Sequence, residues 1–66
     1  MNIVLNGETR SLRPETQLAQ LLQELELAEK RLAVEINREI IPRSRYLLTA
    51  LKNGDQVEIV QAIGGG

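Results

Sequence analysis

The sequence predicts an α+β domain in which one helix crosses one face of a mixed sheet of four to five strands. Three observations predict it. Apolar residues recur at every second position near the start of the chain and in two later stretches, which is the period of half-buried strands. A single apolar stripe at helical spacing lies between them. Turn-forming residues separate these stretches, so the predicted order is β-β-α-β-β-β.

The chain should open with a β-hairpin. The first strand has an apolar face formed by alternate residues, Met1, Ile3 and Leu5. Asn6-Gly7 follows, and because both residues tolerate positive φ, the pair predicts a tight turn with residues 8–12 returning antiparallel. Pro14 should end the second strand, since proline cannot donate a hydrogen bond to a neighbouring strand.

The helix is predicted from residues at i, i+3, i+4 and i+7, namely Leu18, Leu21, Leu22 and Leu25. The Thr16 hydroxyl is expected to cap the first turn, with Glu15 near the positive end of the helix dipole. The same stripe could pair with a partner helix, but it is too short for three heptads. We therefore expect it to pack into the core.

The second half of the chain should add three strands. In order, we expect a strand at 32–36, a turn at 37–39, a short strand at 40–41 closed by Pro42, an irregular or helical segment at 43–52, a turn at 53–55 and a last strand at 57–62. Because the helix makes a crossover connection, the first and last strands can lie side by side and parallel at the sheet centre. That arrangement is a β-grasp, which should span residues 1–63 and leave 64–66 as a flexible tail.

Composition excludes several classes of function. The 66 residues include no cysteine and no histidine, which argues against disulfides, thiol nucleophiles and a metal site. The N-terminus lacks the pattern of a signal peptide, and no apolar run approaches the ~20 residues of a membrane helix. A net charge of −1 and a single aromatic residue argue against nucleic-acid binding. We expect a soluble cytoplasmic domain that binds neither membrane nor nucleic acid.

The sequence also offers no catalytic site of its own. Its nine acidic residues are spread over the predicted helix, turns and outer strand positions. The terminal glycines have no lysine or helix after them, so they do not form a phosphate-binding loop. We therefore expect no intrinsic catalytic residues and do not expect an enzyme.

The tail Gly64, Gly65 and Gly66 is the feature that needs a function. Glycine is costly to order and has no side chain to pack, so the tail adds little to a core. Three glycines extend up to roughly 10 Å and can thread a narrow channel. A terminal carboxylate is a poor electrophile until another protein converts it to an acyl adenylate with ATP. A disordered remnant is the alternative, although the glycines directly follow an apolar strand.

The whole chain resembles the ThiS family, the sulfur carrier proteins of thiamine biosynthesis. The resemblance rests on the opening strand with Asn6-Gly7, the segment AVEINREIIPRSRY (33–46), the stretch NGDQVEIVQAI (53–63) and the ending Gly65-Gly66. The glycine pair alone is shared with other ubiquitin-like proteins, whereas INREIIPR (36–43) is more specific. Asn37-Arg38 stands where Asn-Gly would be more typical, so a type I′ turn is not expected there.

The resemblance implies a ubiquitin-like fold and a carrier cycle. A ThiF-like adenylyltransferase would activate Gly66 with ATP and Mg²⁺, so the carrier itself would bind no cofactor. Sulfur from cysteine, delivered through a cysteine desulfurase, would convert the adenylate to a thiocarboxylate for a ThiG-like thiazole synthase. Gly65 and Gly64 would thread the partner's channel, and Gly64 could serve only for flexibility.

Other functions would use the same fold. A small subunit of molybdopterin synthase and a ubiquitin-like protein modifier share the tail chemistry as far as the adenylate. A β-grasp binding module would use its sheet alone and tolerate loss of the tail.

Partner binding is expected on the sheet face that points away from the helix. The candidate residues are Val4, Val60, Ala62 and Ile63, which alternation and position place beside the tail. Scattered surface apolar residues are the plainer reading of the same pattern. Arg38, Arg43 and Arg45 form a basic group in the sequence that could meet an acidic partner or simply be solvated. Tyr46 is expected to pack in the core or at its edge.

Overall fold

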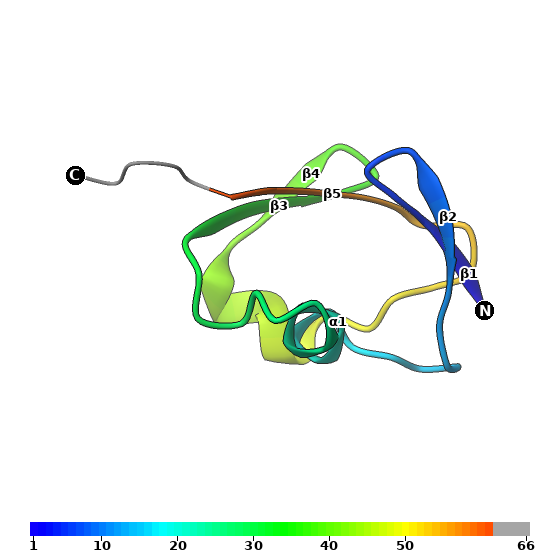
Figure 1. The fold of residues 1–66 in the computed structure, drawn as a ribbon, viewed down its shortest axis with the longest axis horizontal. Helices are drawn as coiled ribbons and strands as arrows, with labels where there is room; N and C mark the ends of the chain where they lie inside the picture. The colour runs from blue at the N-terminus through cyan, green and yellow to red at the C-terminus, as the bar shows by residue number, and fades with distance from the viewer. Residues whose placement is uncertain (62–66) are drawn as a thin grey trace.

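The computed structural model describes residues 1–61 and has the predicted order of elements (Figure 1). These are β1 (Asn2–Leu5), β2 (Glu8–Ser11), α1 (Leu18–Glu24), β3 (Leu32–Ile36), β4 (Glu39–Ile41), the 3₁₀ helix η1 (Arg43–Leu48) and β5 (Gln56–Gln61). The segment left open as irregular or helical is therefore η1. No helix within these 61 residues is long and apolar enough to cross a membrane.

The five strands form one mixed sheet in the order β2-β1-β5-β3-β4. β1 and β5 are parallel, as predicted from the helical crossover, and the other pairs are antiparallel. The first and last strands are thus neighbours at the sheet centre, and β5 has a strand on each side. Both α1 and η1 lie on the same side of the sheet (Figure 1). This confirms the predicted β-grasp architecture.

The core lies between this side of the sheet and the two helices. Each of β1, α1, β3 and β5 contributes at least one side chain with almost no exposed surface, and these are Ile3, Leu18, Leu21, Leu22, Val34 and Val57. Full burial of one such side chain stabilises the fold by roughly 1.5–3 kcal/mol. Tyr46 of η1 is also buried, as the sequence predicted. The apolar stripe of α1 therefore packs in the core.

The start of α1 differs from the prediction. Gln17, not Thr16, is the N-cap residue, and its backbone N–H donates to the side-chain oxygen of Gln20 at 2.8 Å. The Thr16 hydroxyl instead donates to the carbonyl of Arg13 at 2.7 Å, and the Thr16 carbonyl accepts from the N–H of Leu51 at 2.9 Å. Thr16 is buried against the segment that follows η1. A tertiary contact, and not helix capping, therefore determines which hydrogen bonds Thr16 makes.

Strand ends shift by a residue or so from their predicted positions. β2 stops at Ser11, and the next residue, Leu12, is buried in the core instead. β4 begins at Glu39, which pairs with Ile36 and so shortens the predicted turn to two residues. The predicted end of the last strand, Ala62, lies outside the described residues.

The turn between β3 and β4 corrects another expectation. Asn37 and Arg38 both have positive φ, 51° and 71°, as do Asn6 and Gly7 in the first hairpin, 48° and 84°. Two successive positive φ values are the signature of a type I′ turn, whose twist matches that of the flanking strands. The prediction that this turn is not type I′ was wrong. The strand register leaves only two residues to connect β3 and β4, so Arg38 adopts a conformation that glycine favours.

Candidate functional site

The predicted tail residues Gly64, Gly65 and Gly66 lie outside the described residues, as do the candidates Ala62 and Ile63. The structure does describe the strand that leads to them. β5 runs as far as Gln61, which pairs with Leu32 at the start of β3. The described part of the site is therefore β5 and the groups that bond to it.

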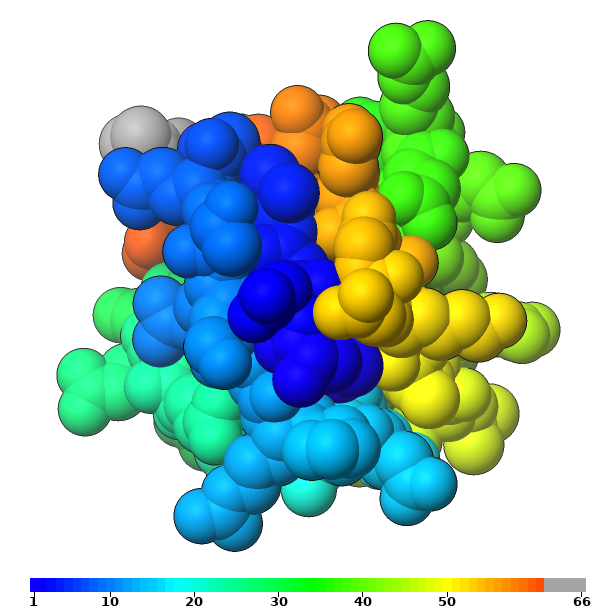
Figure 2. Space-filling model, turned by 90° about the vertical axis from the view of Figure 1, so that its right-hand side faces the viewer, coloured from blue at the N-terminus to red at the C-terminus, as the bar shows by residue number. Residues whose placement is uncertain are grey.

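The start of β5 is anchored to the N-terminus. The N–H of Asn2 donates to the side-chain oxygen of Asn53 at 2.8 Å, and the N–H of Gly54 donates to the carbonyl of Asn2 at 2.7 Å. Figure 2 shows the first residues, in dark blue, beside the loop before β5, in yellow. The turn predicted at 53–55 thus joins the first strand to the start of β5 through hydrogen bonds.

Two asparagine side chains hold β5, and the sequence analysis missed this role. Asn6 bonds to both backbone groups of Ile59: its amide nitrogen donates to the carbonyl at 3.2 Å, and its amide oxygen accepts from the N–H at 2.9 Å. Asn37 accepts from the N–H of Gln56 at 3.0 Å. Asn6 lies in the β1–β2 turn and Asn37 in the β3–β4 turn, so side-chain hydrogen bonds hold β5 at both of its edges. Asparagine at the first position of a two-residue turn is the signal that could have indicated it.

The open face of the sheet, on the side away from α1, carries the other predicted partner residues. Ile3, Val57 and Ile59 point into the core, and Val4 and Val60 point the opposite way, as alternation predicted. Val60 is 65% exposed and Val4 is half-buried.

The register separates these two valines. Val4 lies opposite Gln56 at the start of β5, whereas Val60 lies opposite Ala33 of β3 near its end. Glu58 shares the open face between them. Among the described residues, the apolar pair of this face at the end of β5 is therefore Val60 with Ala33, whereas Val4 lies beside the start of β5.

Two carboxylates face each other on the open face. Glu35 of β3 and Glu58 of β5 are direct cross-strand partners. Together with Arg38 and Gln56 they line a hollow of about 170 Å³. This is smaller than the roughly 300 Å³ at which ligand pockets begin, so the hollow is too small for an enclosed active site. Like charges directly opposite each other destabilise a strand pair, so Glu35 and Glu58 weaken this part of the sheet.

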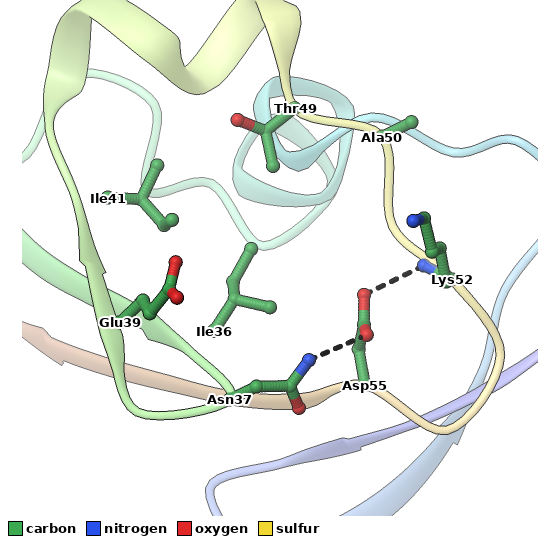
Figure 3. A pocket seen from close by; sticks show the side chains of 8 residues that line it. All are labelled: Ile36, Asn37, Glu39, Ile41, Thr49, Ala50, Lys52 and Asp55. Carbon is green, nitrogen blue, oxygen red and sulfur yellow. Dashed lines mark hydrogen bonds between the residues drawn. The ribbon is translucent and has the colours of Figure 1, made fainter.

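A second hollow, of about 260 Å³, lies beside the start of β5 (Figure 3). The Asp55 carboxylate at this hollow accepts from the Asn37 amide at 3.0 Å and from the backbone N–H of Lys52 at 2.8 Å. These bonds close the turn before β5. Because Asp55 directly precedes β5, this hollow lies at the end of the strand opposite Gln61.

Two of the three arginines predicted as a basic group, Arg38 and Arg43, line different hollows. Arg38 lies in the β3–β4 turn beside the carboxylates of the open face. Arg43, in η1, donates from its guanidinium to the carbonyl of Lys30 at 2.8 Å and lines a hollow with Tyr46 of the same helix. Arg43 is an exposed side chain whose guanidinium also makes this backbone hydrogen bond.

Comparison with known proteins supplies the family. The model of the ThiS family matches residues 3–66. The sulfur carrier protein ThiS of Bacillus subtilis is 40% identical over 63 residues, which cover 94% of this chain and 96% of that protein. The crystal structure of the thiamine biosynthesis protein ThiS from Geobacter metallireducens superimposes with a TM-score of 0.85 at 32% identity and full coverage of both chains.

A longer relative matches as well. The thiazole synthase of Paramagnetospirillum magneticum is 44% identical over all 66 residues, and this chain spans only 20% of the length of that enzyme. The resemblance read from residues 36–43 and from the terminal glycines thus agrees with the family match, the carrier relatives and the fold. The chain belongs to the ThiS family of sulfur carrier proteins.

Proposed function

We propose that this chain carries sulfur for thiazole formation in thiamine biosynthesis, with Gly66 as the group that is modified. The observation that carries the proposal is the family match through residue 66, combined with a central strand that leads directly to the glycines. The carrier itself contributes no catalytic residue in this proposal. Its part is to present a carboxylate to enzymes that do the chemistry.

The chemistry requires successive steps on Gly66. A terminal carboxylic acid has a pKa near ~3.3–3.7, so at neutral pH it is an anion that resists nucleophiles. Attack of a carboxylate oxygen on the α-phosphorus of ATP forms an acyl adenylate and releases pyrophosphate. A persulfide sulfur then displaces AMP and forms an acyl disulfide. A thiol cleaves its S–S bond, which releases the thiocarboxylate and leaves the thiol oxidised in a disulfide. ATP and Mg²⁺ are bound by the activating enzyme, and the carrier supplies the acyl group.

The proposed partners follow from these steps. An adenylyltransferase of the ThiF type would activate Gly66, a cysteine desulfurase would supply sulfur, and a thiazole synthase of the ThiG type would accept it, all in the cytoplasm. The match to a fifth of a thiazole synthase supports the last partner, because in that relative a domain similar to this one is part of the synthase chain. Gly64 and Gly65 are small enough to enter a narrow channel in either enzyme.

The decisive experiment is intact-protein mass spectrometry of the carrier after incubation with a ThiF-type enzyme, ATP, Mg²⁺, cysteine and a cysteine desulfurase. We expect a mass increase equal to replacement of one oxygen by sulfur. The variant lacking Gly66 should show no increase and should have an unchanged circular dichroism spectrum. An unmodified wild-type chain, with an enzyme that modifies a known carrier in the same mixture, would refute the proposal and favour a binding module.

The open face beside the tail is the proposed docking surface. Val60 is the large exposed apolar residue of β5, and a partner that covers it would remove this apolar surface from water. Val60→Glu should leave folding intact and weaken both adenylation and thiazole synthesis. Val4→Glu is the matched variant at the other end of the strand pair and should have the smaller effect. Unchanged activity of Val60→Glu with both enzymes would rule out this surface.

A further inference from the structure

Asn6 directly follows β1, at the point where the pairing between β1 and β5 ends. The pairing between these strands covers only Val4 with Gln56 and Leu5 with Val57. Its last backbone bond runs from the N–H of Asn6 to the carbonyl of Val57 at 2.9 Å. After it, the chain turns away into the hairpin. β5 continues for four residues past Val57, and none of the strands within residues 1–61 pairs with its β1 edge along them.

In a parallel ladder the next two bonds would join β1 to both backbone groups of one residue on β5. That residue is Ile59. The amide of Asn6 makes these two bonds in place of the missing backbone, with its oxygen on the Ile59 N–H and its nitrogen on the Ile59 carbonyl. The Asn6 side chain thus continues the hydrogen-bond ladder between β1 and β5 by one residue of β5. The contact lies two residues before Gln61.

We propose that Asn6 is a positioning residue for the glycine tail: its amide completes the β1 edge of the ladder at Ile59 and so fixes the direction in which β5 delivers the C-terminal residues. The proposal rests on the proposed function, since direction matters only if an enzyme must receive the tail. Without the amide, the end of β5 is held on the β3 edge alone. The strand can then pivot about that edge, and fewer molecules present the tail in the orientation an enzyme binds.

Asn37 provides a matched control within the same chain. It also has positive φ at the first position of a two-residue turn, and its side chain also makes two hydrogen bonds, to the N–H of Gln56 and to the Asp55 carboxylate. These bonds hold the start of β5. Loss of Asn37 therefore removes a comparable number of bonds from the same strand, at the end away from the tail.

The test compares Asn6→Gly with Asn37→Gly. Glycine accepts the positive φ of both turns, so each change deletes the amide without straining the backbone. Amide hydrogen exchange measured by NMR should accelerate at Ile59 by about tenfold in Asn6→Gly, and at Gln56 in Asn37→Gly, because each N–H loses its acceptor. Asn6→Asp keeps the acceptor for Ile59 but not the donor and should lie between wild type and Asn6→Gly.

The functional readout is steady-state adenylation of each variant by the ThiF-type enzyme, at a temperature where all are folded. We expect Asn6→Gly to raise KM by roughly threefold or more with kcat unchanged, because the bound enzyme holds the tail once it has entered. Asn37→Gly should leave both constants near wild type. Equal KM changes in the two variants, or none in either, would overturn the positioning role. A wild-type carrier that is not adenylated would instead count against the proposed function, and the exchange rates would still decide whether Asn6 orders the end of β5.

Discussion

Replacing Arg38 by glycine should stabilise the fold. Arg38 is the second residue of the type I′ turn between β3 and β4 and has φ of 71°. A left-handed conformation costs a residue with a Cβ about 1–2 kcal/mol, because the Cβ approaches the following carbonyl. Glycine avoids this cost but loses about 0.4–1 kcal/mol through the greater freedom of its unfolded chain. The net gain in the free energy of unfolding should be about 1 kcal/mol.

The matched control is Arg38→Ala. Both substitutions remove the guanidinium from beside Glu35 and Glu58, so their difference isolates the backbone term. Urea unfolding followed by circular dichroism should rank glycine above alanine, with the midpoint changed and the slope unchanged. Thermal unfolding should show a gap of about 4–8 °C for a domain of this size. Equal stability of the two variants, or a more stable alanine variant, would refute the strain argument.

Three further outcomes follow from the structure. Leu21→Ala should lower the free energy of unfolding by about 2.7–5 kcal/mol in urea titrations, because Leu21 is fully buried in α1 and the cavity cannot collapse completely; a loss below 1 kcal/mol would show that the core repacks freely. Glu58→Lys should raise stability by about 0.2–1 kcal/mol, since it turns a like-charge pair with Glu35 into an attractive one. That gain should shrink in high salt, and a gain independent of salt would contradict the electrostatic cause. Asp55→Ala should cost about 1–2 kcal/mol, because the turn before β5 loses the acceptor for Lys52 and Asn37, whereas Asp55→Asn should recover part of that loss.

The periodicity of the sequence was sufficient to predict the architecture. Alternate residues such as Ile3 and Val57 identify the inner face of each strand, and the spacing of Leu18, Leu21 and Leu22 identifies the inner face of the helix. The crossover rule then places the first and last strands together. These inferences succeed because burial of an apolar face is the largest favourable term in folding, and it is visible in the order of residues.

Features that depend on register could not be predicted in this way. Alternation assigned Val4 and Val60 to one face, but only the register shows that Glu58 lies between them. Thr16 has the chemistry of a helix cap, yet its contact with Leu51 depends on where a distant segment packs. The amide of Asn6 was read as a turn signal because local sequence shows the turn and does not show which strand passes beside it.

The bond between Asn6 and Ile59 joins residues 53 apart in the sequence, which has a consequence for synthesis. β5 is the last strand of the described residues and the central one, so before it is made the sheet consists of two separate hairpins, β1–β2 and β3–β4. A lone two-stranded hairpin is at best marginally stable in water. The ribosome must therefore synthesise β5 before the domain can fold, and a chain that terminates early has neither a stable sheet nor the glycines. Only a chain translated past its central strand can therefore fold and present a surface for the enzymes to bind.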